Sequence, residues 1–308
     1  MRSVQSLKNA DLAGALKNLQ NEVRDNPADA KHRIFLFQLL AVLGQWDRAL
    51  TQLNVVRDLS AEALSMAQTY QETLNCEALR ADVFLGRRAP LLFGEPSQWM
   101  ALMLEALKLG CQGSAEAVAV REQALEQAPA TAGTLTLYPA DDSLQLEASS
   151  VDDRERSKAA STAEFQWMAD ADSRIGPFLE AIINGKYFWI PFERIRTLQL
   201  EKVADLRDMV WLPARFEWAN GGETVGFVPT RYAGSEAVDD DHVRMAWKTV
   251  WDETSPGQYA GLGQRVLTTD DVEVGITQVA KITFHAAKST AEAGQASTEN
   301  AAGDSIDG

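Results

Sequence analysis

Two stretches of the chain, DLAGALKNLQNEVRDNP at 11–27 and QWDRALTQLNVVRDLSA at 45–61, resemble each other at a spacing of 34 residues. At that spacing Ala15 aligns with Ala49, and Leu16 and Leu19 align with Leu50 and Leu53. A period of this length is typical of helical-hairpin repeats, whose units bury their apolar faces only against neighbouring units. The repeat therefore predicts a stack of antiparallel helices in the first half of the chain.

The stretch AKHRIFLFQLLAVLG between the two copies supplies the first helix of a complete repeat. Leu36 and Leu40 take its large packing positions, and Trp46 takes the aromatic position after the turn. Over about 50 residues the pattern resembles the tetratricopeptide repeat. Phe37 and Ala61 depart from it, because they stand where that repeat has a small residue and a proline.

After residue 61 the period is lost, although helical patterns continue. Residues 60–86 predict one long helix, and 96–110 with 114–129 predict a further helical pair. We therefore expect a tetratricopeptide-like helical domain over residues 1–130.

A curved stack of this kind exposes the first helix of each pair on its concave side, where an amphipathic helix or an extended peptide could bind. In the helix over 30–43, the side opposite Leu36 and Leu40 mixes apolar and polar residues. The candidate partner-binding residues are Lys31, Ile34, Gln38 and Ala41.

Beyond this array the composition changes twice. Residues 131–163 are rich in Pro, Ser, Thr and acids, which predicts an acidic linker or insertion with a short strand at Thr134–Tyr138. Residues 164–286 predict a mixed, β-rich C-terminal domain, and residues 287–308 predict a disordered tail. The expected fold class is thus α+β in two domains, a tetratricopeptide-like helical array followed by a Trp-rich, mainly β domain.

Strand signals dominate the C-terminal domain. Asn220-Gly221-Gly222 separates two strand-like runs and predicts a hairpin. The stretches KYFWIPFERIRTLQL and ITQVAKITF also predict strands, with short helices at 177–184 and near 201–207. Six of the eight tryptophans lie between 165 and 255, where they are expected to be divided between core and partner surface.

Charge limits the choice of partner. The formal net charge is −15, and much of it lies in 141–172 and 286–308. Such a chain repels phosphate backbones and anionic lipid, so neither nucleic acid nor a membrane is an expected partner. No secretory leader, apolar span or metal-ligand cysteine spacing is recognisable, and we expect a cytoplasmic protein with reduced thiols.

The stretch ADADSRIGP at 169–177 is a candidate active or metal site, since Asp170, Asp172 and Arg174 lie close together just before Gly-Pro. Paired acids of this kind occur in metal sites of some nucleotide-sugar transferases, but the further histidines, acids or nucleotide-binding unit that such a site requires are not recognisable. Proline is favoured in the first turn of a helix, and acids are stabilised at its start. We therefore predict a structural role, the start of the helix over 177–184, and no catalytic residue, metal site or cofactor.

Three blocks carry a family resemblance: FQWMADADSRIGPFLEAIINGKYFWIPFERI at 165–195, DLRDMVWLPARFEW, and GLGQR at 261–265. Together they closely resemble the TagJ/ImpE family, also called SciE-type, of type VI secretion accessory proteins. The segment from about 134 to 162 is longer than is usual in that family and resembles an insertion. The residues that match the family motif, with a structural role, are Trp167, Asp170, Asp172, Ser173, Arg174, Gly176 and Pro177.

The resemblance implies a cytoplasmic adaptor rather than an enzyme. Members of this family associate with a helical segment of TssB, the small subunit of the contractile sheath, and are linked to the sheath-disassembling ATPase ClpV. Two alternatives remain open from the residues alone. One is a metal-dependent hydrolase or transferase that uses Asp170 and Asp172, and the other is a repeat-type chaperone for secreted effectors.

Overall fold

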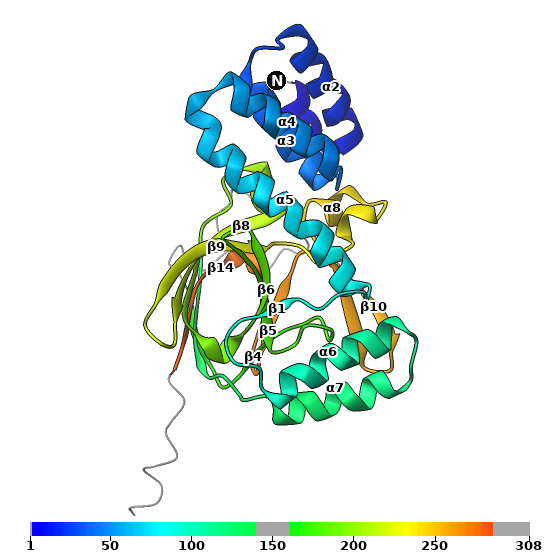
Figure 1. The fold of residues 1–308 in the computed structure, drawn as a ribbon, viewed down its shortest axis with the longest axis vertical. Helices are drawn as coiled ribbons and strands as arrows, with labels where there is room; N and C mark the ends of the chain where they lie inside the picture. The colour runs from blue at the N-terminus through cyan, green and yellow to red at the C-terminus, as the bar shows by residue number, and fades with distance from the viewer. Residues whose placement is uncertain (1, 140–160, 286–308) are drawn as a thin grey trace, which may run out of the picture.

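The computed structural model describes residues 2–139 and 161–285. The first half of the described chain is helical: α1 to α5 pack as successive neighbours, and α6 and α7 form a separate pair beyond the far end of α5 (Figure 1). The bounds are α1 Arg2–Lys8, α2 Leu12–Asp25, α3 Ala30–Val42, α4 Trp46–Leu59, α5 Leu64–Phe84, α6 Gln98–Cys111 and α7 Glu116–Gln127, with α8 Asp241–Arg244 farther along.

The second half is mainly β. A curved sheet of nine described strands has the order β1-β6-β5-β9-β8-β7-β14-β2-β3, and β13-β12-β4 and β10-β11 form two smaller sheets. The strands are β1 Leu91–Leu92, β2 Gly133–Leu137, β3 Thr162–Phe165, β4 Met168–Asp170, β5 Phe178–Ile183, β6 Lys186–Pro191, β7 Ile195–Leu200, β8 Trp211–Trp218, β9 Glu223–Pro229, β10 Thr249–Ser255, β11 Gln258–Gly263, β12 Val266–Thr269, β13 Glu273–Gly275 and β14 Val279–Phe284. The α+β class, with helices first and strands after them, is confirmed.

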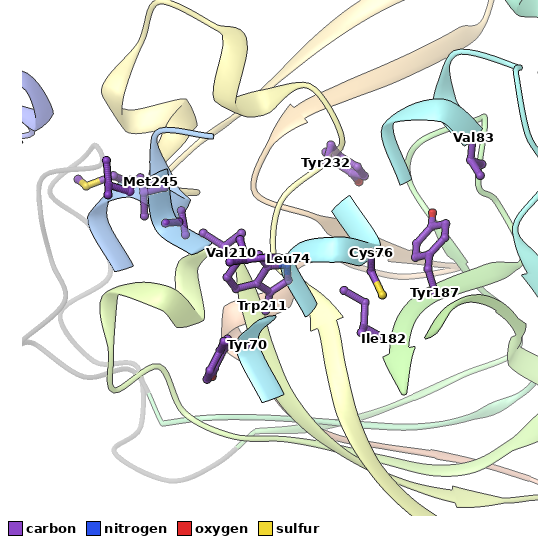
Figure 2. Packing of buried hydrophobic residues seen from close by; sticks show 14 of the residues in the cluster. Tyr70, Leu74, Cys76, Val83, Ile182, Tyr187, Val210, Trp211, Tyr232 and Met245 are labelled. Atoms are coloured by element: carbon purple, nitrogen blue, oxygen red, sulfur yellow. The ribbon is translucent and has the colours of Figure 1, made fainter. Parts of the chain in front are cut away.

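The buried apolar residues form two clusters, to which alternate residues of the large sheet belong. On β8, Leu212 and Phe216 belong to the first cluster, which consists mainly of strand residues, whereas Trp211 belongs to the second. This second cluster lies between the helices and the sheet. Figure 2 shows it from close by, with Cys76 of α5 beside Ile182 of β5.

Helix α5 connects the parts of the molecule. It runs from the N-terminal helices across the sheet toward the α6–α7 pair (Figure 1). Its residues Tyr70, Leu74 and Val83 are buried in the cluster shared with the sheet. At its start Tyr70 packs against Phe227 of β9, with ring centroids 5.2 Å apart.

Several local predictions are confirmed. The hairpin around Asn220-Gly221-Gly222 is β8–β9, the strand expected at Thr134–Tyr138 is β2, and the helical pair is α6–α7. Strand β2 lies within the range expected as a linker, yet it pairs with β14 and β3 in the large sheet. The expected tail, 287–308, and most of the expected linker lie outside the described residues.

The helix predicted over 177–184 is wrong, because Phe178–Ile183 is strand β5. All six residues of β5 are buried, so no polar alternation marks it as a strand. The helix expected near 201–207 is also wrong in place and type, since a 3₁₀ turn forms at Leu206–Met209. The long helix over 60–86 begins instead with a 3₁₀ turn at Ala61–Ala63 and continues as α5.

Candidate functional site

Residues 171–177 form the loop between β4 and β5, and Ala169 and Asp170 are the last residues of β4. Asp172 organises this loop, because its carboxylate accepts a hydrogen bond from the Arg174 backbone N–H at 2.9 Å and its carbonyl accepts one from the Gly176 N–H at 3.0 Å. The Arg174 guanidinium returns to the same carboxylate, with Nη2 2.6 Å from Oδ2. Gly176 has a φ of +54°, and Pro177 leads into β5. The loop therefore closes a turn between strands, and the predicted helix start is wrong.

The same loop holds β11 in place. Ser173 and Tyr259 exchange two hydrogen bonds, from Ser173 N–H to the Tyr259 carbonyl (2.9 Å) and from Tyr259 N–H to Ser173 Oγ (3.0 Å). The Gly261 N–H donates to Asp172 Oδ2 at 2.9 Å. The ring of Tyr232 covers Gly261 so closely that a Cβ there would lie 2.3 Å from it. The loop and the GLGQR stretch are thus hydrogen-bonded to each other and pack together.

Asp170 points into the protein. Its carboxylate forms an ion pair with Arg265 and accepts hydrogen bonds from the Tyr232 hydroxyl and the Asp172 N–H, both at 2.9 Å. Burial raises the pKa of Asp170 to about 7, and Arg265 opposes this rise without overcoming it. Both oxygens of the Asp170 carboxylate therefore contact other buried groups of the protein.

Arg265 also pairs with Glu180 of β5, which carries the network to the helices. Arg80 of α5 donates from Nε to Glu180 Oε1 at 2.7 Å, and the Tyr187 hydroxyl donates to the same oxygen at 2.5 Å. Burial opposes the charge of Glu180, but Arg80 and Arg265 outweigh it and hold the pKa of this carboxyl at about 2. Glu180 is therefore an ionised group, fully enclosed and fully paired.

Helix α5 adds a second carboxylate, Glu77, one turn before Arg80. Its Oε2 lies 3.4 Å from Arg80 Nη1, and its Oε1 accepts a hydrogen bond from Trp211 Nε1 at 2.7 Å. Arg80 also donates to the Arg231 carbonyl at 2.7 Å. These bonds join α5 to β5, to β8 and to the segment after β9, so the network fixes the helix against the sheet.

Arg231 extends the network to α3. Its guanidinium donates to the carbonyls of Val42 at 2.7 Å and Ala41 at 3.1 Å, in the last turn of that helix, where carbonyls lack the regular helical hydrogen bond. The Ala41 carbonyl also accepts a hydrogen bond from the Gly44 N–H at 3.1 Å. Burial lowers the pKa of Arg231 to about 10, a value at which it stays charged at neutral pH. The end of α3 is thereby tied to the β region.

The charged groups of this network are enclosed and are paired with one another. Asp170, Glu180 and Arg265 are almost fully enclosed, and each charge already has a partner at contact distance. In residues 2–139 and 161–285, no group of His, Cys, Asp and Glu side chains is arranged to hold a metal ion. The network can position elements, but it offers a substrate neither access nor an unused proton acceptor.

The four predicted partner-binding residues of α3 do not share one accessible face. Lys31 is exposed and Ile34 is half-buried, whereas Gln38 and Ala41 are buried. The second half of α3 packs against the 3₁₀ turn at Leu206–Met209 and belongs to the cluster shared with the sheet. The chain's own β region therefore covers the side of α3 that a repeat array would offer to a partner, and the open part is the first half of the helix.

The tryptophans of the β region divide as expected between core and surface. Trp189, Trp211 and Trp218 are buried, while Trp167 and Trp251 are about 40% exposed. Trp167 thus differs from the rest of its motif, which lies in the enclosed loop.

Sequence reasoning missed the residues that link the helices to the motif: Glu77, Arg80, Glu180 and Arg231. The sequence does contain a signal. Arg80 and Glu77 stand among the apolar positions of α5, and Glu180 interrupts an apolar run. Charges at such positions are expected to be paired, but apart from the contact between Glu77 and Arg80 their partners lie about 100 or more residues away. None of the helices in the described part of the chain has the length and hydrophobicity of a bilayer span.

Comparison with known proteins gives a matching family, a matching sequence and a matching structure. The family model described as "ImpE protein" matches residues 162–283, the β region with both motifs. The type VI secretion system accessory component TagJ of Pseudomonas aeruginosa is 43% identical over 286 residues, which cover 92% of this chain and 91% of that protein. The crystal structure of protein VPA1032 from Vibrio parahaemolyticus superposes with a TM-score of 0.76 over 95% of this chain and 100% of that one, at 22% identity, and so shares the fold.

Proposed function

The chain belongs to the ImpE family of type VI secretion accessory proteins, and from this premise we propose that it is a non-enzymatic, cytoplasmic adaptor. Its proposed partner is a helical segment of TssB, the small subunit of the contractile sheath. The adaptor would act in sheath assembly or recycling, together with the ATPase ClpV.

One observation carries the non-enzymatic part of the proposal. The acids of the family motif, Asp170 and Asp172, are buried and are held by Arg265, Arg174 and backbone N–H groups. A hydrolase or transferase would need these carboxylates open to substrate or metal. Their use as internal supports favours a protein whose motif builds a scaffold.

The open half of α3 is the proposed contact surface for TssB. Lys31 is exposed and Ile34 is half-buried. Because they are three residues apart, both lie on the same side of the helix. An apolar residue beside a cation suits the apolar edge and an acidic side chain of an amphipathic helix. Gln38 and Ala41 would support this surface from within the core.

Titration calorimetry of the full chain against a peptide of the cognate TssB N-terminal helix tests the proposal. We expect saturable binding that Ile34→Glu weakens at least tenfold, because a buried contact would gain an unpaired charge. Leu125→Glu, on α7, is the matched control and is expected to bind as the wild type does, since Leu125 is equally apolar and 43% exposed.

The other outcomes separate the alternatives. Binding retained by a folded Ile34→Glu variant would contradict the α3 surface while preserving the adaptor. No binding of the TssB peptide, together with binding of several unrelated effectors, would favour the chaperone. A rise in melting temperature on adding a divalent cation, lost in Asp170→Asn, would favour the hydrolase.

A further inference from the structure

The large sheet is almost split between β5 and β9. Strand β9 pairs with β8 over seven residues, but it meets β5 at a single position, Ile182 opposite Phe227. Beyond that position β5 turns away at Asn184-Gly185, where both residues have positive φ. The first part of β9 therefore has a partner strand on one side only.

The free side of β9 exposes backbone groups. In an antiparallel ladder, the N–H and C=O of alternate residues point to opposite neighbours. Phe227 directs its pair toward β5, and so Val225, two residues earlier, directs its own pair to the same side. Opposite Val225 the register reaches Asn184, which lies in the turn. The Val225 side chain is 65% exposed.

A cavity of about 450 Å³ lies along this free edge. Helix α5 forms one wall with Thr69, Glu72 and Thr73. The outer face of the sheet supplies apolar surface from Val225 and Phe227.

Two carboxylates, Glu72 of α5 and Glu201 after β7, line the same cavity. Neither forms an ion pair with another described residue, whereas Arg215 on the rim faces Glu223 at 3.7 Å. The cavity therefore combines a strand edge with one partner strand, an apolar floor and two carboxylates that form no ion pair with another described residue.

We propose that this edge is a docking site for an extended segment of another protein, which adds a strand to β9. The segment would carry a Lys or Arg among apolar residues, with the cation directed into the cavity toward Glu72 and Glu201 and apolar side chains on Val225 and Phe227. Main-chain bonds to Val225 supply affinity in such strand addition, and the pockets supply specificity. The site is separate from α3 and does not depend on the TssB surface.

Charge favours a partner in trans. A second copy of this chain, paired edge to edge, would bring its own Glu72, Glu201 and Glu223 toward the same carboxylates. The segments outside the described residues are acidic as well, with six acids against three bases over 140–160 and four against one over 286–308. A basic, apolar strand from another protein complements the cavity better than any of these.

Fluorescence anisotropy with labelled eight-residue peptides on the full chain provides the test. The probe is Ser-Thr-Val-Thr-Arg-Thr-Val-Ser, in which Val and Arg share one face of an extended strand, and its counterpart has Glu in place of Arg. We expect saturable binding of the Arg probe and at least tenfold weaker binding of the Glu probe. The double variant Glu72→Lys, Glu201→Lys should bind the Arg probe at least tenfold more weakly, whereas Glu126→Lys on α7 should match the wild type.

Val225→Pro tests the backbone. It removes the N–H that faces away from β8 and spares the β8 ladder, so a folded variant should lose the probe. Absence of wild-type binding, or equal binding by the double variant, would overturn the proposal. Dimerisation in sedimentation experiments that Val225→Pro abolishes would assign the edge to a second copy and overturn it too. Ile34→Glu should leave probe binding unchanged, so this test and the TssB test fail independently.

Discussion

The carboxylate of Glu180 is held by two arginines that are far apart in the sequence, Arg80 and Arg265, and by the Tyr187 hydroxyl. Removing one member of a buried ion pair leaves the other charge unsatisfied, which costs about 3–5 kcal/mol. We expect Arg80→Met to lower the free energy of unfolding by that amount. Urea denaturation measures it.

The matched control is a surface arginine. Arg196 lies 3.8 Å from Glu217, and both side chains are largely exposed. Exposed pairs contribute between zero and about 1 kcal/mol, so Arg196→Met should change the free energy of unfolding by less than that. Equal effects of Arg80→Met and Arg196→Met would contradict a stabilising role for the network.

Glu180 also predicts a pH dependence. Its pKa is about 2 in the folded protein, against an ordinary value of 4.5. The unfolded chain binds more protons between these values, so this contribution, about 3 kcal/mol, is complete above about pH 4.5 and is lost as pH falls toward 2. The difference in unfolding free energy between wild type and Glu180→Gln should shrink over that window. A difference that stays constant from about pH 6 to pH 2.5 would contradict the assignment.

At the scale of elements, the β10–β11 hairpin shows why glycine stands in GLGQR. Gly263 has a φ of +94°, and a Cβ there would lie 2.0 Å from the Lys248 carbonyl oxygen, which belongs to the backbone and cannot move aside easily. Gly257, at the tip of the same hairpin, has a φ of +72° and no atom within 4 Å of a Cβ. We expect Gly257→Ala to cost about 1 kcal/mol and Gly263→Ala about 3 kcal/mol or more.

Thermal denaturation of the two variants measures this contrast. The single hairpin provides its own control, because both substitutions add the same methyl group at a positive φ. Equal shifts in melting temperature would mean that the hairpin moves to accommodate residue 263, and that the close approach to Lys248 is not a constraint.

The elements also show how far the sequence could predict the fold. The α2–α4 region was predictable, because the sequence itself repeats there at a spacing of 34 residues. Strand β5 was not predictable, because its six residues are all buried and show no alternation of polar and apolar side chains. Glu180 within this run also favoured a helix, since Glu is a good helix former. That acid is buried only because Arg80 and Arg265 reach it. A better local signal was Asn184-Gly185, whose positive φ angles form the tight turn between β5 and β6.

The candidate site was predictable only in part, for the same physical reason. Asp172 and Arg174, two residues apart in the motif, pair with each other. The contacts of Asp170 with Arg265 and of Glu77 with Trp211 join residues from distant elements. Likewise, the burial of Gln38 and Ala41 depends on the β region that covers α3, which no pattern within that helix could indicate.

At the scale of the whole molecule, the helices and the sheet share one apolar cluster and one charged network. Tyr70 of α5 packs against Trp211 of β8 at 5.9 Å, Trp46 of α4 packs against the same ring at 6.0 Å, and Arg231 binds the end of α3. The division at residues 130 and 164 stays a prediction about sequence units. The contacts across it favour unfolding as one cooperative unit.

We therefore expect a single transition in which tryptophan fluorescence, far-ultraviolet circular dichroism and calorimetry coincide. Arg231→Met should shift all three midpoints together, because it removes a buried charge that binds α3 to the β region. Two resolved transitions in the wild type, with the helices melting first, would show that the interface is weaker than its contacts suggest. If the molecule unfolds as one unit, Arg231 and α5 connect α3 rigidly to the sheet. The two proposed docking surfaces, on α3 and on β9, would then be held at a fixed distance from each other.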